Sequence, residues 1–360
     1  MKIKERYIAK TLLTYSLVVL FVWLGIYSFF NFLAELNTVG TVNYTVIKAL
    51  QYIVFQAPDV AYDQASPVIL LGCVLGMGHL ATTGQLIIFR ASGISILGIT
   101  WITLKNALIF IIFLVLIGET VAPIFNKHAD NQRAIALGQN ILSRNQDGFW
   151  IRDGDNFINV ENNVDGRFFN GLTIIEVDKS NSIKRVVSSD SAIFDGKSLN
   201  LNETNLYSIN SENIVEDITL KERGQYKKIV AFDQDLIDSL EKEPKDLPSF
   251  TIIKQIKFLK DNKLRAEVFE LELYKRLVKP LTLVAMILLA MLFIFGSTRD
   301  ATLGRKIFFG VAIGLLFELI SRIGGAVALS FKFSPLFSTF IPAIVVIIVA
   351  ITVLINKSTQ

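Results

Sequence analysis

The chain has 360 residues, of which 52% are hydrophobic and 19% are charged, and its mean hydropathy is +0.48. This composition excludes an ordinary soluble protein and predicts several membrane spans. The net charge of +4 is small, and we expect no nucleic-acid partner. Cys73 is the only cysteine, and the two histidines, His79 and His128, lie in different segments. The sequence therefore predicts neither an intramolecular disulfide nor a His/Cys metal site.

Residues 11–33 form the first predicted span, and four cations precede it: Lys2, Lys4, Arg6 and Lys10. A signal peptide would have an apolar core of about 7 to 15 residues and a small-residue cleavage site. The apolar run here is longer and is not followed by such a site. We therefore expect this segment to be retained in the membrane.

Six segments are long enough for a hydrocarbon core of roughly 30 Å, which needs about 20 apolar helical residues. They cover residues 11–33, 61–82, 100–122, 277–296, 305–328 and 335–355. The stretch YTVIKALQYIVF at 44–55 is apolar but too short to span. It predicts a short helix at the membrane surface that leads into the second span.

Lysine and arginine are distributed unequally between the two sides of the predicted spans, and this bias sets orientation. One side receives Lys2, Lys4, Arg6, Lys10, Arg90, Lys105, Arg299, Arg305, Lys306 and Lys357. The short loops of the other side hold only Lys48 and Lys332. We expect both termini to face the cytoplasm, and the large insert after the third span to lie outside it.

The insert, about residues 125–270, is polar and rich in Asn, Asp and Ser. GFWIRDGDNFINVENN predicts two strands joined at residues 153–156, and further turns are expected at KSNS, FDGKS and LNET. Such closely spaced turns favour a β-sandwich or an open jelly roll. KDLPSFTIIKQIKFLKDNK and RAEVFELELYKRLVKP then predict helices that return to the membrane.

The predicted fold class is membrane α-helical, with six transmembrane helices and an inserted extracytoplasmic all-β domain like a jelly roll. The expected boundaries are residues 1–123 for the first three spans, 124–272 for the β domain and 273–360 for the last three spans.

No motif in the sequence supplies energy or hydrolytic chemistry. The phosphate loop G-x-x-x-x-G-K-[ST] is absent, because GRK at 304–306 lacks the preceding glycine spacing. G-x-S-x-G and H-E-x-x-H are absent as well. Paired carboxylates of the β domain are a remaining route to catalysis, but such residues are more often solvated loop charges. We expect no catalytic residue, no metal and no resident cofactor, so a partner must bind ATP.

Some ionisable residues lie at membrane depth, where they are functional candidates. Glu318 and Arg322 are one turn apart in the fifth span, so they either neutralise each other or serve a ligand. Glu119 lies late in the third span, within the membrane or already at its interface.

Four further cations are predicted near the outer ends of the third and fourth spans: Arg133, Lys275, Arg276 and Lys279. They either extend to the interface as long side chains or bind an anionic headgroup.

The segment GQLIIFRASGIS, residues 84–95, is unusually apolar for a connector between spans. Leu86, Phe89 and Ile94 recur at helical spacing, and Arg90 is its only charge. The pattern predicts a short helix with an apolar face.

Several fragments, in this order and spacing, resemble the lipopolysaccharide export permease family LptF/LptG over nearly the whole chain. They are APDVAYDQASPVILLGCVLGMGHLATTGQL, FRASGIS, IGETVAP, NQRAIA, GFWIRDGDNFINVE, KPLTLVAMILLAMLFIFGSTRDATLGRK and the IP pair at 341–342. The GFW and FIFGSTR fragments favour the LptG branch over LptF.

The resemblance implies a permease subunit of an ABC-type exporter that extracts lipopolysaccharide from the bacterial inner membrane. The lipid passes through periplasmic jelly rolls toward the outer membrane. The implied partners are an LptF-type permease in a heterodimer, a cytoplasmic LptB-type ATPase dimer, a single-span LptC beside the first span, and LptA.

Residues 84–95 resemble the family's coupling helix, which docks into a groove of the ATPase. The expected ATPase-coupling residues are Gln85, Leu86, Phe89, Arg90 and Ile94. Gln85 departs from the family pattern, since members usually carry a glutamate there.

A second departure concerns the lipid. Asn31, Asn37 and Thr38 stand where LptG-type members tend to carry lysines. The remaining candidates for lipid binding are Arg133, Lys275, Arg276, Lys279 and Arg322, with Glu318 beside the last. Arg322 is the first choice, because arginine forms two charge-assisted bonds to a phosphate and because the fifth span forms the family's lateral gate with the first.

Two other functions stay open on the sequence alone. A non-transporting transducer would use a cytoplasmic ATPase only to move the outer domain, and a membrane enzyme would have an extracytoplasmic active site. Gly310, Gly314, Gly324 and Gly325 suit close and adjustable helix packing in a transporter, but a rigid scaffold could use them equally.

Overall fold

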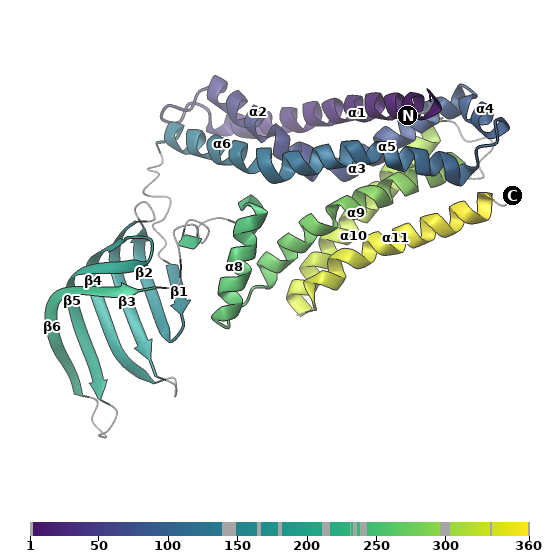
Figure 1. Cartoon of the computed structure of the whole chain (residues 1–360). Coiled ribbons are helices and arrows are strands. Elements are labelled where there is room, and N and C mark those ends of the chain that lie inside the picture. Colours follow the sequence, from purple (N-terminus) through teal and green to yellow (C-terminus); the bar gives the residue numbers. More distant parts are fainter. Residues whose placement is uncertain are drawn as a thin grey trace. The chain divides into compact units, whose positions relative to one another are not determined.

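The computed structural model describes residues 3–138, 149–163, 167–178, 182–210, 217–230, 232, 236–237, 243–295, 303–331 and 333–358. The chain divides into two compact units (Figure 1). A helical unit comprises Met1–Arg133 and Glu270–Gln360, and a β unit comprises Ala134–Phe269.

Six helical segments among the described residues are long and apolar enough to cross a membrane, which confirms the predicted six spans. They contain α1 (Ile3–Glu35), α3 (Ala65–Thr82), α5 (Ile96–Leu116), α9 (Glu267–Phe295), α10 (Leu303–Phe331) and α11 (Pro335–Ser358). The third of these segments continues from α5 through a π-helical turn, η2 (Ile117–Val121), into α6 (Ala122–Ala136).

The short helix predicted at 44–55 is longer in the structure. As α2 it runs from Val46 to Asp63, and its first turn is capped by the Thr45 hydroxyl, which accepts from the Lys48 backbone N–H. Pro58 lies inside α2 without ending it. The second span therefore begins at Ala65, only one residue after α2 ends, rather than at residue 61.

Helix α3 is the centre of the helical unit. Of its most apolar window 72% is buried, compared with 11% for α1 and 22% for α10. The neighbouring helices approach it closely at glycines: Gly72 faces Ser16 of α1, and a Cβ at Gly314 of α10 would lie 2.5 Å from Leu70. The glycines of the fifth span thus serve close helix packing.

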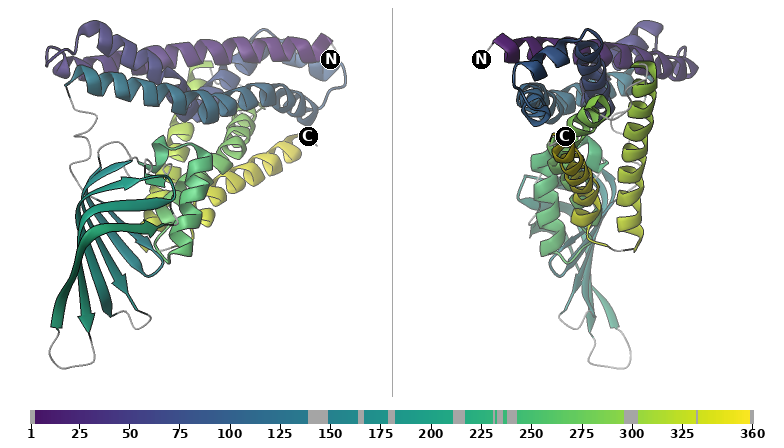
Figure 2. Two further views of the ribbon diagram at one scale, coloured as in Figure 1. Left: turned by 60° about the vertical axis from the view of Figure 1, so that its left-hand side comes forward. Right: turned by 90° about the vertical axis from the view of Figure 1, so that its right-hand side faces the viewer.

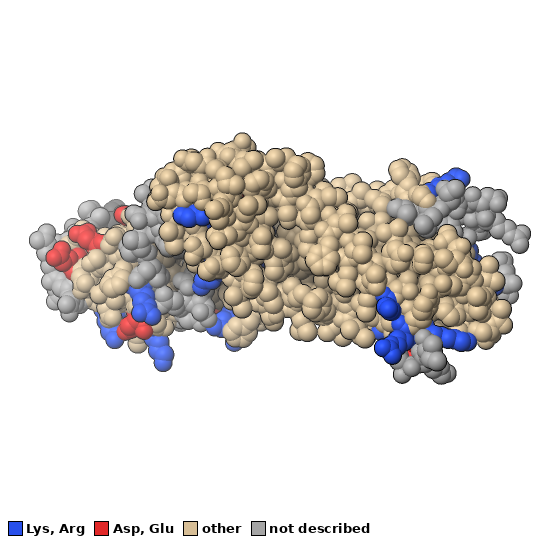
Figure 3. All heavy atoms as spheres, turned by 90° about the horizontal axis from the view of Figure 1, so that it is seen from above, with Lys and Arg blue, Asp and Glu red and all other residues tan. Residues whose placement is uncertain are grey.

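The face of the helical unit seen in Figure 3 is largely uncharged. Figure 3 shows a broad area without Lys, Arg, Asp or Glu over the middle of this unit, with charged side chains toward its ends. An uncharged band between charged ends is typical of a protein that crosses a bilayer.

The described part of the β unit contains one curled antiparallel sheet of six strands, ordered as they occur in the chain (Figure 2). The strands are β1 (Phe149–Asp153), β2 (Asn156–Asn163), β3 (Phe168–Val177), β4 (Ile183–Phe194), β5 (Ser198–Asn210) and β6 (Asp217–Ile229). Alternate residues such as Leu172 and Ile174 point into an apolar core. The inserted all-β domain is therefore confirmed.

Two of the predicted turns are confirmed and one is wrong. Asp153 pairs with Asn156 across a tight turn in which Gly154 has a φ of +60°, and the FDGKS segment joins β4 to β5. LNET, however, lies inside β5, where the register shifts between Leu201 and Thr204 and Glu203 has a φ of +52°. Residues that favour a turn here form a bulge, because the strand continues to pair on both sides of it. The KSNS turn falls largely outside the described residues, although β3 and β4 end and begin on either side of it.

The β unit also contains the 3-10 turn η3 (Pro244–Asp246) and helix α8 (Ser249–Asp261). Phe258 of α8 packs against the core of the sheet, and the Gly154 N–H donates to Asn262 Oδ1 at 2.7 Å. Helix α8 is thus fixed to the β unit.

Candidate functional site

The apolar connector predicted at 84–95 contains a seven-residue helix, α4 (Gln85–Ala91). Gly84 precedes it with a φ of +73°, a conformation that favours glycine. Both chain termini and α4 lie at the same end of the helical unit (Figure 1), and Lys4 Nζ donates to Ser92 Oγ at 2.9 Å.

The two faces of α4 have different neighbours. Leu86 is 5% exposed and belongs to the core of the helical unit, and Phe89 and Ile94 pack against the same core. Ile87 and Ile88 point the other way and are 71% and 66% exposed, and Arg90 is exposed beside them. The predicted apolar face of Leu86, Phe89 and Ile94 therefore anchors α4 to its own chain, and Ile87, Ile88 and Arg90 form its exposed surface.

Gln85, at the position that departs from the family pattern, lies at the start of α4. Its Oε1 is buried and has no hydrogen-bond partner among the residues that the structure describes.

A polar cluster lies where α2 ends. The Tyr62 hydroxyl donates to Glu119 Oε1 at 3.5 Å, and Arg276 Nη1 lies 3.7 Å from Glu119 Oε2. Lys279 Nζ donates to the Asp63 carbonyl at 2.8 Å and lies 5.4 Å from the Tyr62 ring centre. Burial and the nearby Glu119 charge raise the pKa of Tyr62, so its hydroxyl stays protonated. Glu119, whose surroundings the sequence left open, is thus part of an ion-pair network on the π-helical turn.

Glu318 and Arg322 form an ion pair, as one of the two predicted interpretations requires. Arg322 Nε donates to Glu318 Oε1 at 3.0 Å, and its Nη2 lies 3.9 Å from Asp63 Oδ2. The Arg322 side chain is nevertheless 62% exposed. It can therefore keep Glu318 as a partner and still meet a ligand.

Lys275 is also exposed, and it borders the same part of α10. A Cβ at Gly325, one turn after Arg322, would lie 3.8 Å from Lys275 Cε. By contrast, Arg276 is 11% exposed and occupied by Glu119 and Glu272.

Arg133 is not part of this group. Its Nε donates to Glu35 Oε1 at 2.5 Å, and the Tyr44 hydroxyl donates to the same oxygen at 2.9 Å. Burial and the bond to Glu35 raise the pKa of Tyr44 to about 12. Glu119 and Arg133 are fourteen positions apart along η2 and α6, which corresponds to about 20 Å along the helix. The four outer cations expected to cluster are thus divided between two places.

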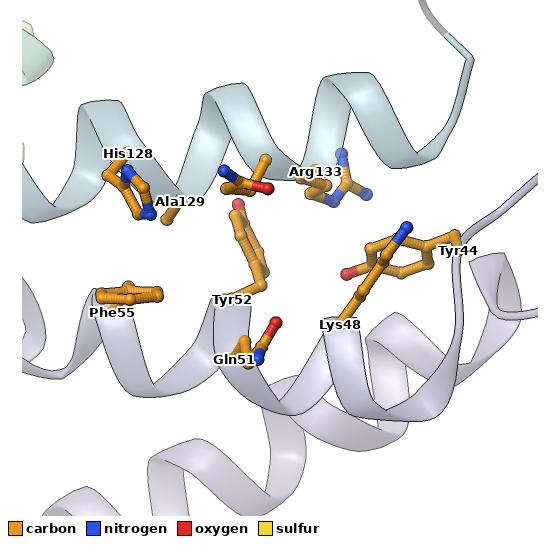
Figure 4. Close-up of a pocket in the computed structure, with 9 residues that line it drawn as sticks. Tyr44, Lys48, Gln51, Tyr52, Phe55, His128, Ala129 and Arg133 are labelled. Carbon is orange, nitrogen blue, oxygen red and sulfur yellow. The ribbon is translucent and has the colours of Figure 1, made fainter.

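A cavity of about 290 Å³ adjoins Arg133 between α2 and α6 (Figure 4). Aromatic rings, amides and two cations line it: Tyr44, Lys48, Gln51, Tyr52, Phe55, His128, Ala129, Gln132 and Arg133. The guanidinium of Arg133 lies 5.3 Å from the Tyr52 ring centre, and Lys48 donates to the Asn43 carbonyl. Both cations are therefore held by this chain's own groups.

Comparison with known proteins gives the same family over nearly the whole chain. Residues 6–356 match the family described as lipopolysaccharide export system permease LptF/LptG. The chain is 26% identical over 359 residues to the lipopolysaccharide export system permease protein LptG of Escherichia coli K12, covering 98% of each chain. It is 25% identical over 346 residues to the protein of the same description from Haemophilus influenzae, covering 96% of each. With six membrane-spanning segments, an inserted β unit and this match, the chain belongs to the lipopolysaccharide export system permease family LptF/LptG, whose permeases move lipopolysaccharide from the inner membrane toward the outer membrane.

Proposed function

We propose that this chain is the LptG-type half of a permease heterodimer in the bacterial inner membrane and that α4 couples it to a cytoplasmic LptB-type ATPase dimer. The observation that carries the proposal is the outward pair Ile87 and Ile88, two large apolar side chains on a short helix. Such side chains favour burial in a protein groove, since each gains roughly 1.5–3 kcal/mol on leaving water. Arg90 beside them adds a charge that fixes orientation.

The proposed orientation places both termini and α4 in the cytoplasm and the β unit in the periplasm. The excess of lysine and arginine in the loops on the α4 side supports it. The remaining partners in this proposal are an LptF-type permease, LptC and LptA. The mostly exposed apolar faces of α1 and α10 leave room for a second permease and for LptC.

The docking proposal is tested with Ile88→Asp in the full chain, coexpressed with its partners. A carboxylate in an apolar groove costs several kcal/mol if it stays charged and buried. We expect the ATPase to be lost from the complex purified in mild detergent. The matched control is Ile47→Asp in α2, because Ile47 is 68% exposed, as Ile88 is at 66%, and because α2 lies at the end of the helical unit opposite α4 (Figure 1). Normal recovery of the ATPase with Ile88→Asp would exclude this face as the dock.

Leu86→Asp and Phe89→Asp serve as a second comparison, since these side chains pack against the chain's own core. We expect them to lower the thermal stability of the helical unit as well as ATPase recovery. Ile88→Asp should change recovery alone.

We further propose that Arg322 and Lys275 hold the phosphates of lipid A, because they are the exposed cations of the five expected. We assign Arg133, Arg276 and Lys279 structural roles, on the basis of their contacts with Glu35, Glu119 and Asp63.

Arg322→Ala should weaken photo-crosslinking of lipopolysaccharide to the first and fifth spans while the complex still assembles. Restoration of the crosslink by a second change, Glu318→Ala, would show instead that Arg322 only neutralises Glu318. Unchanged crosslinking in the single variant would likewise contradict the lipid role.

A further inference from the structure

Helix α8 presents two faces that differ in burial. Ile252 and Gln255 are almost fully buried, and Phe258 packs against the core of the sheet. With Asn262 bonded to the β1–β2 turn, these positions form one side of the helix. This side is the one that holds α8 on the β unit.

The opposite side is exposed, basic and partly apolar. At 100° per residue, Phe250, Ile253, Lys254, Lys257 and Lys260 fall within an arc of about 120° centred opposite the buried positions. Phe250 is 68% exposed and Ile253 is 52% exposed, while Lys257 and Lys260 are exposed on either side of Ile253. The ammonium group of Lys254 lies 4.9 Å from the Phe250 ring centre.

The basic character continues past the end of the helix. Lys263 and Arg265 are exposed, and so is the apolar side chain of Leu264 between them. Asp261 is the one acidic residue on the exposed arc of α8 among the residues described. The patch, defined as Phe250, Ile253, Lys254, Lys257 and Lys260, is therefore strongly positive.

An anionic lipid surface fits this combination. Large apolar side chains on such a helix enter the boundary between headgroups and acyl chains, and lysines beside them pair with lipid phosphates. A purely apolar protein groove would leave the lysine ammonium groups desolvated without partners.

The length of chain that follows also favours the bilayer as the occupant. Five residues, 262–266, separate α8 from α9, and they can span at most about 18 Å. Helix α9 has 29 residues, about 44 Å, so it exceeds a hydrocarbon core of roughly 30 Å by only about 14 Å. Helix α8 is therefore tethered within reach of a membrane surface, and its length of about 20 Å can lie along it.

We propose that the α8 patch docks on the anionic lipid surface of the membrane that the helical unit crosses. Phe250 and Ile253 enter the headgroup boundary and the lysines contact lipid phosphates. The contact ties the β unit to the bilayer independently of any protein partner.

The test uses the full chain in lipid nanodiscs, with an environment-sensitive fluorophore on Ile253→Cys. The native Cys73 is buried, and the unsubstituted chain gives its background labelling. The matched control is Ile193→Cys on β4, an isoleucine also exposed to solvent. Nanodiscs contain phosphatidylcholine alone or mixed with phosphatidylglycerol, together with a lipid that carries a quencher. We expect quenching at position 253 with phosphatidylglycerol and little at position 193.

Charge reversal separates lipid docking from attachment by the fluorophore itself. Each lysine near an anionic surface strengthens attraction about fivefold. Lys257→Glu combined with Lys260→Glu should therefore weaken docking by at least about 30-fold and reduce quenching at 253 to the control level. Unchanged hydrogen exchange in β3 and β4 would show that the β unit of this variant is folded, so that its loss of quenching supports the proposal. Equal quenching at 253 and 193, or quenching that ignores both lipid charge and the two reversals, would overturn the proposal. Shielding of the fluorophore at position 253 from solvent that occurs only when another protein copurifies would also overturn the proposal.

Discussion

Glu176 on β3 faces the core of the sheet together with Leu172 and Ile174, although it is charged. Its carboxylate accepts from Arg185 Nε at 2.9 Å and from Lys228 Nζ at 2.6 Å, and Arg185 Nη2 lies 2.8 Å away. Burial raises the pKa of Glu176, but the bond and charge of Lys228 and the charge of Arg185 outweigh it and hold the pKa below its ordinary value. Three strands, β3, β4 and β6, thus meet at one carboxylate.

Replacing Glu176 by Gln keeps the shape and removes the charge. Removing one partner of a fully buried ion pair costs about 3–5 kcal/mol, because the other charge is left uncompensated. The Glu176 side chain is 10% exposed and Lys228 is 20% exposed, but Arg185 is 35% exposed and can be rehydrated. We therefore expect Glu176→Gln to lower the free energy of unfolding of the β unit by about 2–3 kcal/mol.

Peptide-resolved hydrogen exchange of the full chain in detergent measures this loss. A change of 2–3 kcal/mol corresponds to about 30- to 150-fold faster exchange of the most protected amides in β3, β4 and β6. Glu243→Gln is the control, because the Glu243–Lys245 pair is solvent-exposed and such pairs contribute little. Exchange rates equal to those of the control would show that the Glu176 ion pairs do not stabilise the sheet and that its apolar core alone does.

Two other changes follow from the contacts. Gly118→Ala should lower the thermal stability of the helical unit in detergent, because a Cβ at this position would overlap the Tyr62 ring. The control Gly25→Ala, where a Cβ would meet open space, should be neutral or stabilising by up to about 1 kcal/mol. Equal effects of the two substitutions would contradict the close contact at Gly118. Because the pKa of Glu176 is lowered in the folded state, its contribution to stability is present above the ordinary carboxyl pKa and disappears as the pH falls through the lowered value. Acid unfolding followed by Trp150 fluorescence, in a chain with Trp23→Phe and Trp101→Phe, should show this loss, and the same acid dependence after Glu176→Gln would rule it out.

The spans and most of the sheet were predictable from the sequence because each depends on local pattern. Apolar runs of about 20 residues have few alternatives to a membrane helix, and the 153–156 turn needs the positive φ that Gly154 supplies. The LNET segment misled because the same polar residues suit a turn and a bulge, and only pairing with β4 and β6 decides between them. The prediction placed the end of the short helix at residue 55, whereas α2 continues to Asp63, because Pro58 is accommodated inside the helix.

The candidate sites were less accessible, because they depend on which face of a helix is buried. Both faces of α4 are apolar, so periodicity identified the helix but not the outward pair Ile87 and Ile88. The available sequence signal for an exposed apolar face was the pair of isoleucines beside Leu86 and Phe89, because a helix that packs only on one side does not need apolar side chains on the other. Arg133 pairs with Glu35 and Arg276 pairs with Glu119. Each partner is far from its arginine in the sequence, so the sequence alone did not show that the two arginines lie in different places.

Lipopolysaccharide transfer by the reconstituted complex tests most directly whether α4 couples this permease to ATP hydrolysis. Proteoliposomes would contain this chain, the proposed partners (an LptF-type permease, an LptB-type ATPase and LptC) and lipopolysaccharide, with LptA outside. The measured quantity is lipopolysaccharide photo-crosslinked to LptA. We predict ATP-dependent crosslinking that is abolished by Ile88→Asp and retained with Ile47→Asp. ATP hydrolysis by an intact complex without transfer of lipopolysaccharide would contradict the export role and favour a transducer that only moves its outer domain.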